Sequence, residues 1–373
     1  MEAELKVLVS GGGTGGHIYP ALTIVEAIRE IEPNAEFLYV GTETGLEADI
    51  APREGIPFEK MDLAGFERKI SFENVTRAFK ACKGLLKAKR IVDEFKPSVA
   101  IGTGGYVCGP VLFVASLMGT PSMIQEQNAV AGITNKILSK VVTKVALGTE
   151  AALSSFPKDK CVYTGNPIRR SVMEGDKTKA LKEFGFKEDL PILLITGGSR
   201  GARSINNAVL ELVKKQAAEK RVQILHVTGT LGYESVLESV KDAGVDLEKS
   251  LNIKVVSYLY NMPMALSMAD LLIMRAGAIA LAEVAAVGKP AVLIPYPYAT
   301  GNHQEANARA FVEKGAARMI LDRDLTGEIL IKEVEEIISD VDKRKRMAAA
   351  MKGLGKPEAA AMIAKIAVEI ARK

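Results

Sequence analysis

The chain has 373 residues, which is too long for one ordinary core and predicts two domains of about 150 to 200 residues each. Hydrophobic residues make up 48% of the chain, charged residues 25% and aromatic residues 5%, as in a soluble globular protein. The formal net charge of +4 is too small to indicate nucleic-acid binding, which would gather basic and aromatic residues on one face.

The spacing of the cysteines, the N-terminal segment and the length of the apolar runs indicate the cellular compartment of the protein. Cys82, Cys108 and Cys161 are far apart and form neither a Cys-x-x-Cys pair nor a zinc-ligand spacing, which is typical of a reducing cytosol. The N-terminus leads directly into a strand and lacks the segments of a secretory signal. The apolar run 111–118 is far shorter than the ~20 residues of a membrane span. We expect a cytoplasmic protein that can contact a membrane from that side.

Short apolar runs rich in β-branched residues alternate with amphipathic helical stretches along the chain. Continuous apolar strands separated by helices predict parallel sheets covered on both faces. In the first half, strands are expected at residues 6–10, 36–41, 98–102, 121–125, 144–148 and 161–165. In the second half, strands are expected at residues 191–197, 222–229, 253–258, 270–275, 290–297 and 317–321.

The pattern restarts half-way along the chain. The stretch KVLVSGGGTGGH from Lys6 is echoed by PILLITGGSRGA from Pro191, each a strand, a glycine-rich turn and a helix. This repetition predicts an α/β protein of two Rossmann-like, doubly wound parallel-sheet domains, residues 1–165 and 166–356. The last helix, 357–373, is expected to pack back on the first domain. Ligands of such sheets bind at the carboxyl ends of the strands.

The first glycine-rich turn contains Gly11, Gly13 and Gly16 in the spacing G-x-G-x-x-G, the fingerprint of dinucleotide binding. That interpretation also needs an acidic residue at the end of the second strand, to hold the ribose hydroxyls. Thr42 ends that strand instead, and Glu43 comes too late. The sequence therefore argues against a nicotinamide or flavin enzyme, and we predict no cofactor.

His17 directly follows these glycines, and His226 and His303 are the only other histidines. An imidazole in a glycine-rich loop suits a general base, because its ordinary pKa lies near neutral pH. A histidine that caps its own helix fits the pattern equally well.

Three further loops follow strands of the first half or begin helices of the second. The turn 101–110 is again rich in glycine, and two such loops favour a large phosphorylated ligand held by backbone N–H groups. Residues 125–128 read Gln-Glu-Gln-Asn and suit sugar hydroxyls, although a plain solvated loop is the alternative. In the second half, a helix that begins near Ala278 can bind a pyrophosphate, and Glu283 can accept from ribose hydroxyls.

Taken in order, these motifs resemble the MurG family, which transfers N-acetylglucosamine (GlcNAc) from UDP-GlcNAc to lipid I in bacterial peptidoglycan synthesis. The resemblance rests on GGTGGHIYPA, GTGGYVCGP, QEQNAVAGITNK, TGNPIRR, TGGSRGA, RAGAIALAEVAAVGKPAVLIPYP and NHQEANA, and it spans roughly residues 6–320. It implies the GT-B fold, with the two domains facing a cleft, an inverting mechanism, and an undecaprenyl-linked acceptor. It also implies that the first domain faces acceptor and membrane and that the second binds the donor.

On the donor side, the resemblance implies that Arg169 and Ser199 line the site. The backbone of Leu259 would read the uracil, and Gln304 would hold the GlcNAc hydroxyls. The phosphates and the ribose would lie on the segment Ala278, Ile279, Ala280, Leu281, Ala282 and Glu283. Three positions depart from the commoner pattern of the family: Gln125, Arg200 and Ala280.

On the acceptor side, the loop of Thr14, Gly15 and Gly16, with His17, would face the reaction centre, and Asn128 would contact the transferred sugar. The acceptor loop would be Gly104, Gly105 and Tyr106. His17 is the first candidate for the base that takes the acceptor proton, and Glu126 or a water is the alternative.

No metal ion is expected. The Asp-x-Asp triplet Asp322 to Asp324 precedes a helix expected near Leu325, so we interpret it as a helix N-terminal signal.

An anionic membrane surface is the remaining expected partner, along with other proteins of cell-wall synthesis. The segment 68–90 carries many basic residues against one acid, Glu73, with apolar residues near helical spacing. Lys136, Lys140 and Lys144 could extend this basic surface. The alternative is an ordinary surface helix whose apolar stripe faces its own sheet.

Three other functions fit part of the sequence: a UDP-GlcNAc 2-epimerase of the same fold, a nicotinamide dehydrogenase, and a sugar-binding module without catalysis. The epimerase is the strongest alternative, but its elimination chemistry needs several acidic residues around the sugar. The residues at 125–128 are mainly amides, which favours the transferase.

Overall fold

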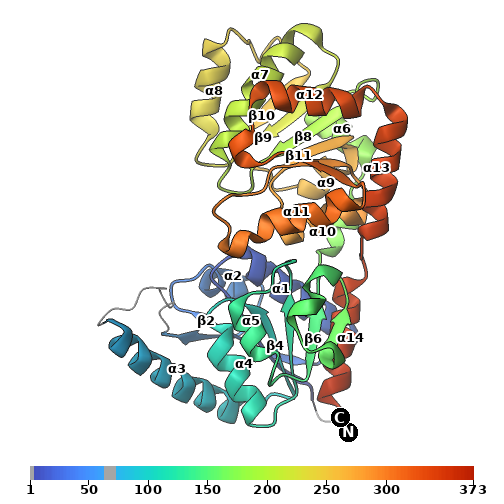
Figure 1. Ribbon diagram of the computed structural model, residues 1–373. Coiled ribbons are helices and arrows are strands. Elements are labelled where there is room, and N and C mark those ends of the chain that lie inside the picture. Colours follow the sequence, from blue (N-terminus) through green and yellow to red (C-terminus); the bar gives the residue numbers. More distant parts are fainter. Residues whose placement is uncertain (1–3, 63–72) are drawn as a thin grey trace. The chain divides into compact units, whose positions relative to one another are not determined.

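The computed structural model describes the backbone of residues 4–62 and 73–373 and the side chains of residues 4–62 and 83–373. The chain divides into two compact units (Figure 1). Unit 1 comprises Met1–Ile168 and Glu358–Lys373, and unit 2 comprises Arg169–Pro357. Each unit has its own parallel sheet with helices on both faces, as the alternation of apolar strands and helices predicts.

Unit 1 is built on a seven-stranded parallel sheet in the order β3-β2-β1-β4-β5-β6-β7. Its strands are β1 (Lys6–Gly11), β2 (Glu36–Thr42), β3 (Phe58–Met61), β4 (Val99–Gly104), β5 (Ser122–Glu126), β6 (Lys144–Leu147) and β7 (Cys161–Tyr163). Its helices are α1 (Gly15–Ile31), α2 (Glu47–Arg53), α3 (Glu73–Phe95), α4 (Cys108–Leu117), α5 (Ile133–Leu138) and α14 (Ala359–Ala371).

Unit 2 repeats this plan with a six-stranded sheet in the order β10-β9-β8-β11-β12-β13. Its strands are β8 (Ile192–Thr196), β9 (Gln223–Val227), β10 (Ile253–Val256), β11 (Leu271–Met274), β12 (Ala291–Leu293) and β13 (Ala317–Met319). Its helices are α6 (Lys177–Phe184), α7 (Arg203–Glu219), α8 (Tyr233–Asp242), α9 (Met262–Met268), α10 (Ala278–Val287), α11 (His303–Glu313), α12 (Gly327–Ile338) and α13 (Val341–Leu354).

Alternate residues of each strand enter the cores on opposite faces of the sheet. In β1, Val7 and Val9 join the core beneath α1 and α14, whereas Leu8 joins the core beneath α4. The last helix, α14, packs against α1, and its Ile363 is fully buried in that core (Figure 1). Because β1 and β4 are neighbours in the sheet, the loops that follow them meet at its carboxyl edge.

Candidate functional site

The two glycine-rich loops of unit 1 lie directly against each other. The Gly12 N–H donates to the Gly104 carbonyl over 3.3 Å. A Cβ atom at Gly105 would overlap the Gly12 carbonyl, and one at Gly11 would overlap the Thr103 hydroxyl. Gly105 also has a φ of +86°, which side chains rarely adopt. The glycines are therefore required by the close approach of the two backbones.

His17 lies in the first turn of α1, beside this contact. Its Nδ1 is 3.0 Å from the Gly12 carbonyl oxygen, which can only accept, so Nδ1 carries a proton, and in the neutral imidazole the lone pair then lies on Nε2. A Cβ at Gly104 would come within 3.1 Å of Nε2. The absence of a side chain at Gly104 thus leaves Nε2 facing the loop of Gly104, Gly105 and Tyr106. The Nδ1 contact is to a carbonyl that precedes the helix, so it does not cap the helix.

The other two histidines are poorly placed to be the base. His226 is buried in β9, where burial lowers its pKa to about 4, and its Nε2 contacts the Asn206 side chain. His303 begins α11 in unit 2, and its Nδ1 donates to the Thr300 carbonyl over 2.7 Å. Only His17 belongs to the glycine-rich loops of unit 1.

The stretch 125–128 differs from the expected row of sugar-binding side chains. Gln125 and Gln127 are buried and bond to each other, and Gln125 Nε2 donates to the Asn166 side chain over 2.8 Å. Asn166 in turn donates to the Gln127 carbonyl. This network uses up the two glutamine side chains inside the unit, so of the four residues only Asn128 is partly exposed.

Glu126 is also buried, and its carboxylate organises the loop that follows it. Oε1 accepts from the backbone and side-chain N–H groups of Asn128, and Oε2 accepts from Gly132 N and Asn135 Nδ2, each over 2.9 Å. Four donors from its own loop occupy the carboxylate. This geometry suits Glu126 to hold Asn128 in place and makes it a weaker candidate for the base than His17.

Unit 2 repeats the close loop contact of unit 1. The loop after β8 contains Ser199, which is exposed, and Gly201, at which a Cβ would overlap the Thr228 carbonyl. A Cβ at Gly229, after β9, would overlap Gly201 itself. The conformation of the exposed turn at Ser199 is therefore fixed by close backbone contact with the loop after β9.

Helix α10 begins at Ala278, and its N-cap residue is the extended Gly277, which has no side chain with which to cap the first turn. Ala278, Ile279, Ala280 and Ala282 are partly exposed, whereas Leu281 is in the core. The N-terminus of a helix attracts anions through its N–H groups and its partial positive charge. This end of α10 therefore has the general properties of an anion-binding helix N-terminus.

Glu283 on α10 forms an ion pair with Arg169, which precedes the 3₁₀ turn Arg170–Glu174. Arg169 Nη2 is 3.2 Å from Glu283 Oε1, and Glu283 is buried while Arg169 is partly exposed. Burial raises the pKa of Glu283, and the Arg169 guanidinium partly offsets this. The two residues assigned to ribose and donor binding are therefore preorganised against each other.

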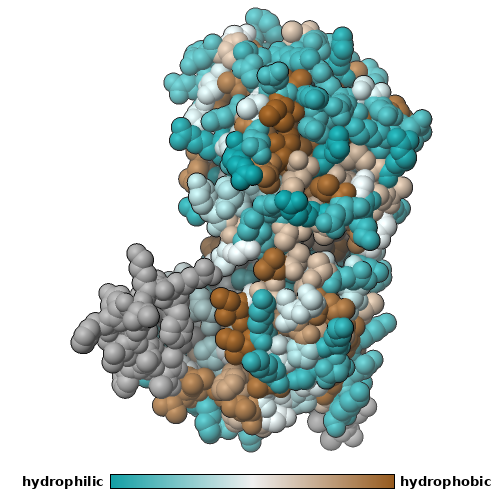
Figure 2. Space-filling model, in the orientation of Figure 1, coloured by the Kyte–Doolittle hydropathy of each residue, from teal (hydrophilic) through white to brown (hydrophobic). Residues whose placement is uncertain are grey.

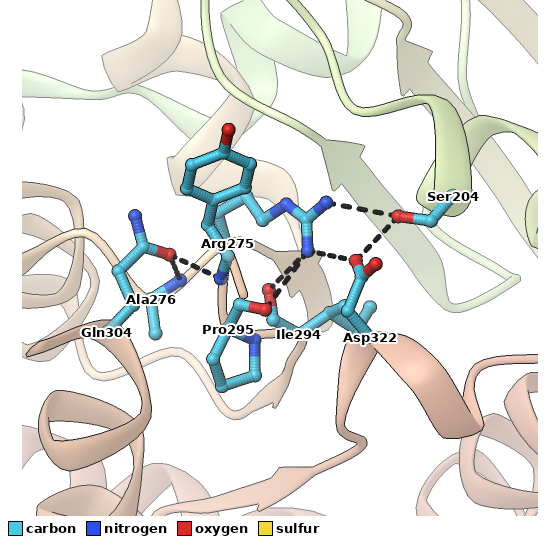
Figure 3. Close-up of polar contacts among 8 residues, drawn as sticks. Ser204, Arg275, Ala276, Ile294, Pro295, Gln304 and Asp322 are labelled. Atoms are coloured by element: carbon cyan, nitrogen blue, oxygen red, sulfur yellow. Dashed lines mark hydrogen bonds and ion pairs between the residues drawn. The ribbon is translucent and has the colours of Figure 1, made fainter. Parts of the chain in front are cut away.

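Arg275 ties together four segments around this helix (Figure 3). Its guanidinium donates to the Ile294 and Pro295 carbonyls over 3.1 and 3.2 Å, and it also bonds to Ser204 and Asp322. The Ser204 hydroxyl donates to the same Asp322 oxygen. The ends of β11 and β12, the start of α7 and the turn at Asp322 are thereby joined by one partly buried cation.

The role of Asp322 corrects our interpretation of the triplet 322–324. The triplet forms its own 3₁₀ turn, and α12 begins later, at Gly327, where the Thr326 hydroxyl accepts from Ile329 N. Asp322 instead neutralises Arg275, a partner 47 residues earlier. Within the described side chains, no group of three or more His, Cys, Asp and Glu residues could hold a metal ion.

Gln304 is oriented by the same loops. Its Oε1 accepts from Ala276 N and Tyr296 N over 3.1 and 2.9 Å, as Figure 3 shows. Both oxygen lone pairs are directed at backbone, so the side chain can only donate, through Nε2, to a ligand. Leu259 lies in the loop after β10 between Tyr258 and Tyr260, whose rings meet edge to face at 4.8 Å.

Comparison with known proteins identifies the chain. The glycosyltransferase family 28 N-terminal domain matches residues 7–147, and the family 28 C-terminal domain matches residues 192–363. A UDP-N-acetylglucosamine–N-acetylmuramyl-(pentapeptide) pyrophosphoryl-undecaprenol N-acetylglucosamine transferase of Bacillus cereus is 47% identical over 99% of this chain and 100% of its own length. The chain belongs to the MurG branch of glycosyltransferase family 28.

Solved structures agree with this assignment. The crystal structure of Acinetobacter baumannii MurG covers 98% of this chain and 99% of its own, with a TM-score of 0.79 and 28% identity. The fold is therefore GT-B, as expected. UDP-GlcNAc 2-epimerase from Neisseria meningitidis is similar as well, with a TM-score of 0.67 over 98% of this chain and 99% of its own, but at 15% identity it shows the fold alone.

Prediction for Glu283. A raised carboxyl pKa means that the stability from this group is present below its ordinary pKa, about 4.3, and lost as the pH rises through the folded-state value. Glu283→Gln, which does not titrate, should therefore gain in melting temperature relative to the native protein between pH 4 and pH 7. Glu238→Gln, on the exposed face of α8, is the control and should show no such trend. If the melting temperature of the native protein instead rises relative to that of Glu283→Gln as the pH increases, the raised pKa of Glu283 would be contradicted.

Proposed function

We propose that this protein transfers GlcNAc from UDP-GlcNAc to the C4 hydroxyl of the N-acetylmuramyl group of lipid I, undecaprenyl-pyrophosphoryl-MurNAc-pentapeptide, and so forms lipid II. The family and the name of its Bacillus cereus relative support the reaction. The observation that carries the mechanism is the orientation of His17, whose Nε2 holds a lone pair beside the glycine-rich loops of unit 1.

The donor is assigned to unit 2. The start of α10, Ser199 and Arg169 would stabilise the charge of the pyrophosphate, and Glu283 would accept from the ribose hydroxyls. The Leu259 backbone would read the uracil. Gln304 would donate to a GlcNAc oxygen through Nε2, because its Oε1 is held by Ala276 and Tyr296.

The acceptor is assigned to unit 1, at Thr14, Gly15, Gly16 and the loop of Gly104, Gly105 and Tyr106. Tyr106 is 39% exposed and lies next to Gly13, so its ring is available to a ligand. His17 Nε2 takes the proton of the acceptor hydroxyl as its oxygen bonds to the anomeric carbon. The bond from that carbon to UDP breaks, and UDP leaves with the electron pair. Attack from the opposite face turns the α-linked donor into a β-1,4 link.

We also propose that unit 1 docks on the cytoplasmic face of an anionic membrane, where the acceptor's lipid tail is anchored. No helix in the described part of the chain is long and apolar enough to cross a bilayer. Much of the segment 68–90 lies outside the described side chains, but Lys83, Lys87, Lys89 and Arg90 on α3 belong to them. Lys89 and Arg90 pair with Asp93 and Glu94, so the basic charge is smaller than the sequence suggests.

Exposed apolar side chains supplement that charge. Leu86 on α3 is 69% exposed, and Ile133 and Ile137 on α5 are 64% and 58% exposed. Helix α4 packs against both α3 and α5, and it ends at the exposed Leu117. Figure 2 shows hydrophobic groups gathered beside α4 and α5. We therefore expect binding through both anionic lipid attraction and shallow apolar insertion.

Prediction for the reaction. UDP release from UDP-GlcNAc should require an added short-chain lipid I analogue and should yield the disaccharide product. His17→Ala should lower kcat by about 10²- to 10⁴-fold, the usual contribution of a general base, while UDP-GlcNAc affinity stays within about twofold. His303→Ala is the matched control and should keep most of the rate. UDP release without acceptor, or formation of the 2-epimer, would refute the proposed transfer reaction. An unchanged kcat in His17→Ala would refute the role of His17 as the general base.

Prediction for the membrane. Co-sedimentation with vesicles should require anionic lipid and weaken at high salt, because charges screened beyond ~10 Å contribute little at 0.1 M. The double variant Ile133→Asp and Ile137→Asp should bind several-fold more weakly, as should Lys83→Glu with Lys87→Glu. Leu251→Asp, at a site 77% exposed in unit 2, is the control and should bind normally. Equal binding to neutral vesicles, or a similar loss in the control, would contradict this docking face.

A further inference from the structure

Glu47, the first residue of α2, is a charged side chain with no exposed surface. Its Oε1 accepts from the backbone N–H of Thr42 over 3.0 Å and from the Thr42 hydroxyl over 2.7 Å. Its Oε2 accepts from Gly13 N over 3.3 Å. No cation among the described side chains pairs with it. A carboxylate buried in this way is costly unless donors of this kind surround it, so the site is built for it.

Three glycines from separate segments make room for this carboxylate. A Cβ at Gly12 or Gly45 would overlap the carboxylate oxygens of Glu47, and one at Gly41 would overlap its Cγ. None of the three has a positive φ, so backbone conformation does not require glycine there. What these positions share is contact with Glu47. The end of β1, the end of β2 and the turn before α2 are therefore shaped around one side chain.

The contact with Gly13 reaches His17 through a single peptide unit. The N–H of Gly13 and the carbonyl of Gly12 belong to the same peptide group, on its opposite edges. Glu47 Oε2 accepts from that N–H, and the carbonyl on the other edge accepts from His17 Nδ1 over 3.0 Å. Hydrogen bonds in series polarise one another, so a carboxylate on the N–H makes the carbonyl a stronger acceptor.

We propose that Glu47 is a positioning residue for His17: it acts through the Gly12–Gly13 peptide to hold the proton on Nδ1 and keep the lone pair on Nε2. This arrangement is a carboxylate–histidine pair with one peptide inserted between the partners. It rests on the proposed transfer reaction, in which Nε2 takes the acceptor proton. Glu47 touches no reacting atom.

Among the residues that the structure describes, the other groups close to the imidazole are neutral or bonded elsewhere. Tyr39 donates its hydroxyl to the Gly11 carbonyl, and burial, followed by the charge of Glu47, raises its pKa. From β4, Thr103 and Gly104 face His17 and carry no charge. Glu126, at the end of β5, is held by its own loop. From α14, Arg372 pairs with Glu32, which follows the opposite end of α1. Of the described carboxylates, Glu47 is thus the one that these hydrogen bonds couple to the ring.

Prediction for Glu47. Glu47→Gln places an amide N–H₂ against donors, so kcat should fall by about 10- to 100-fold, the usual loss when a supporting hydrogen bond is removed. UDP-GlcNAc affinity should not change, because the donor site is assigned to unit 2. The acid limb of the pH profile of kcat should move to lower pH, since a nearby carboxylate favours the imidazolium and its removal lowers the pKa of His17. Glu43→Gln, an exposed glutamate of the same turn paired with Lys60, is the control and should change neither quantity.

A purely structural role would lower kcat without moving the acid limb, and that result would overturn the proposal, as would an unchanged kcat. If Glu47→Gln does not fold, ¹⁵N NMR of the histidines of the native protein decides. His17 should then show a protonated Nδ1 and a bare Nε2 at neutral pH, and the reverse tautomer would overturn the proposal. The tautomer is measured without substrate, so this result is independent of the lipid II assay. A failure of the lipid II assay would count against the proposed reaction and not against the tautomer of His17.

Discussion

The sites in both units depend on the backbone of one strand-end loop lying directly against that of its neighbour. In unit 1 the loop after β1 meets the loop after β4, with Gly105 over the Gly12 carbonyl. In unit 2 the loop after β8 meets the loop after β9, with Gly201 over Thr228 and Gly229. Parallel strands bring these loops to one edge, and glycine alone lets them touch. In unit 1 this contact fixes the turn that leads to His17, and in unit 2 it fixes the turn that contains Ser199.

Each unit then uses one charged side chain, fully buried in unit 1 and partly buried in unit 2, to keep its loops in place. In unit 1, Glu47 gathers three glycines and two N–H donors around a carboxylate. In unit 2, Arg275 gathers two carbonyls, Ser204 and Asp322 around a guanidinium. A buried charge without such partners would strongly destabilise the folded protein. The charge therefore requires these partners to stay in place around it. Gln304, which we assign to the donor site, is oriented by the backbone N–H groups of Ala276 and Tyr296.

The fold could largely be predicted from the sequence. Apolar runs bounded by glycine mark nearly every strand, and the restart at Pro191 marks the second sheet. The glycine-rich loops could also be predicted, because they are contiguous motifs with a local physical reason, and the role of His17 stays a prediction.

What the sequence did not indicate are partners far apart along the chain. Gln125 and Gln127 look like ligand-binding side chains until Asn166, 41 residues beyond Gln125, is seen to bond inside the unit. Asp322 looks like the start of a helix until Arg275 is seen beside it. Glu47 was missed because nothing in its neighbourhood of the sequence suggests burial, although glycines at 41 and 45 are a signal in hindsight.

The central claim is that unit 2 holds the nucleotide while unit 1 supplies the base. Hydrogen–deuterium exchange of the whole protein with and without UDP tests it most directly, since UDP lacks the sugar that would engage unit 1. The account predicts slower exchange around residues 197–202, 257–261 and 276–284, with little change around 11–17 and 102–106. Protection confined to the loops of unit 1, with none at α10, would contradict it.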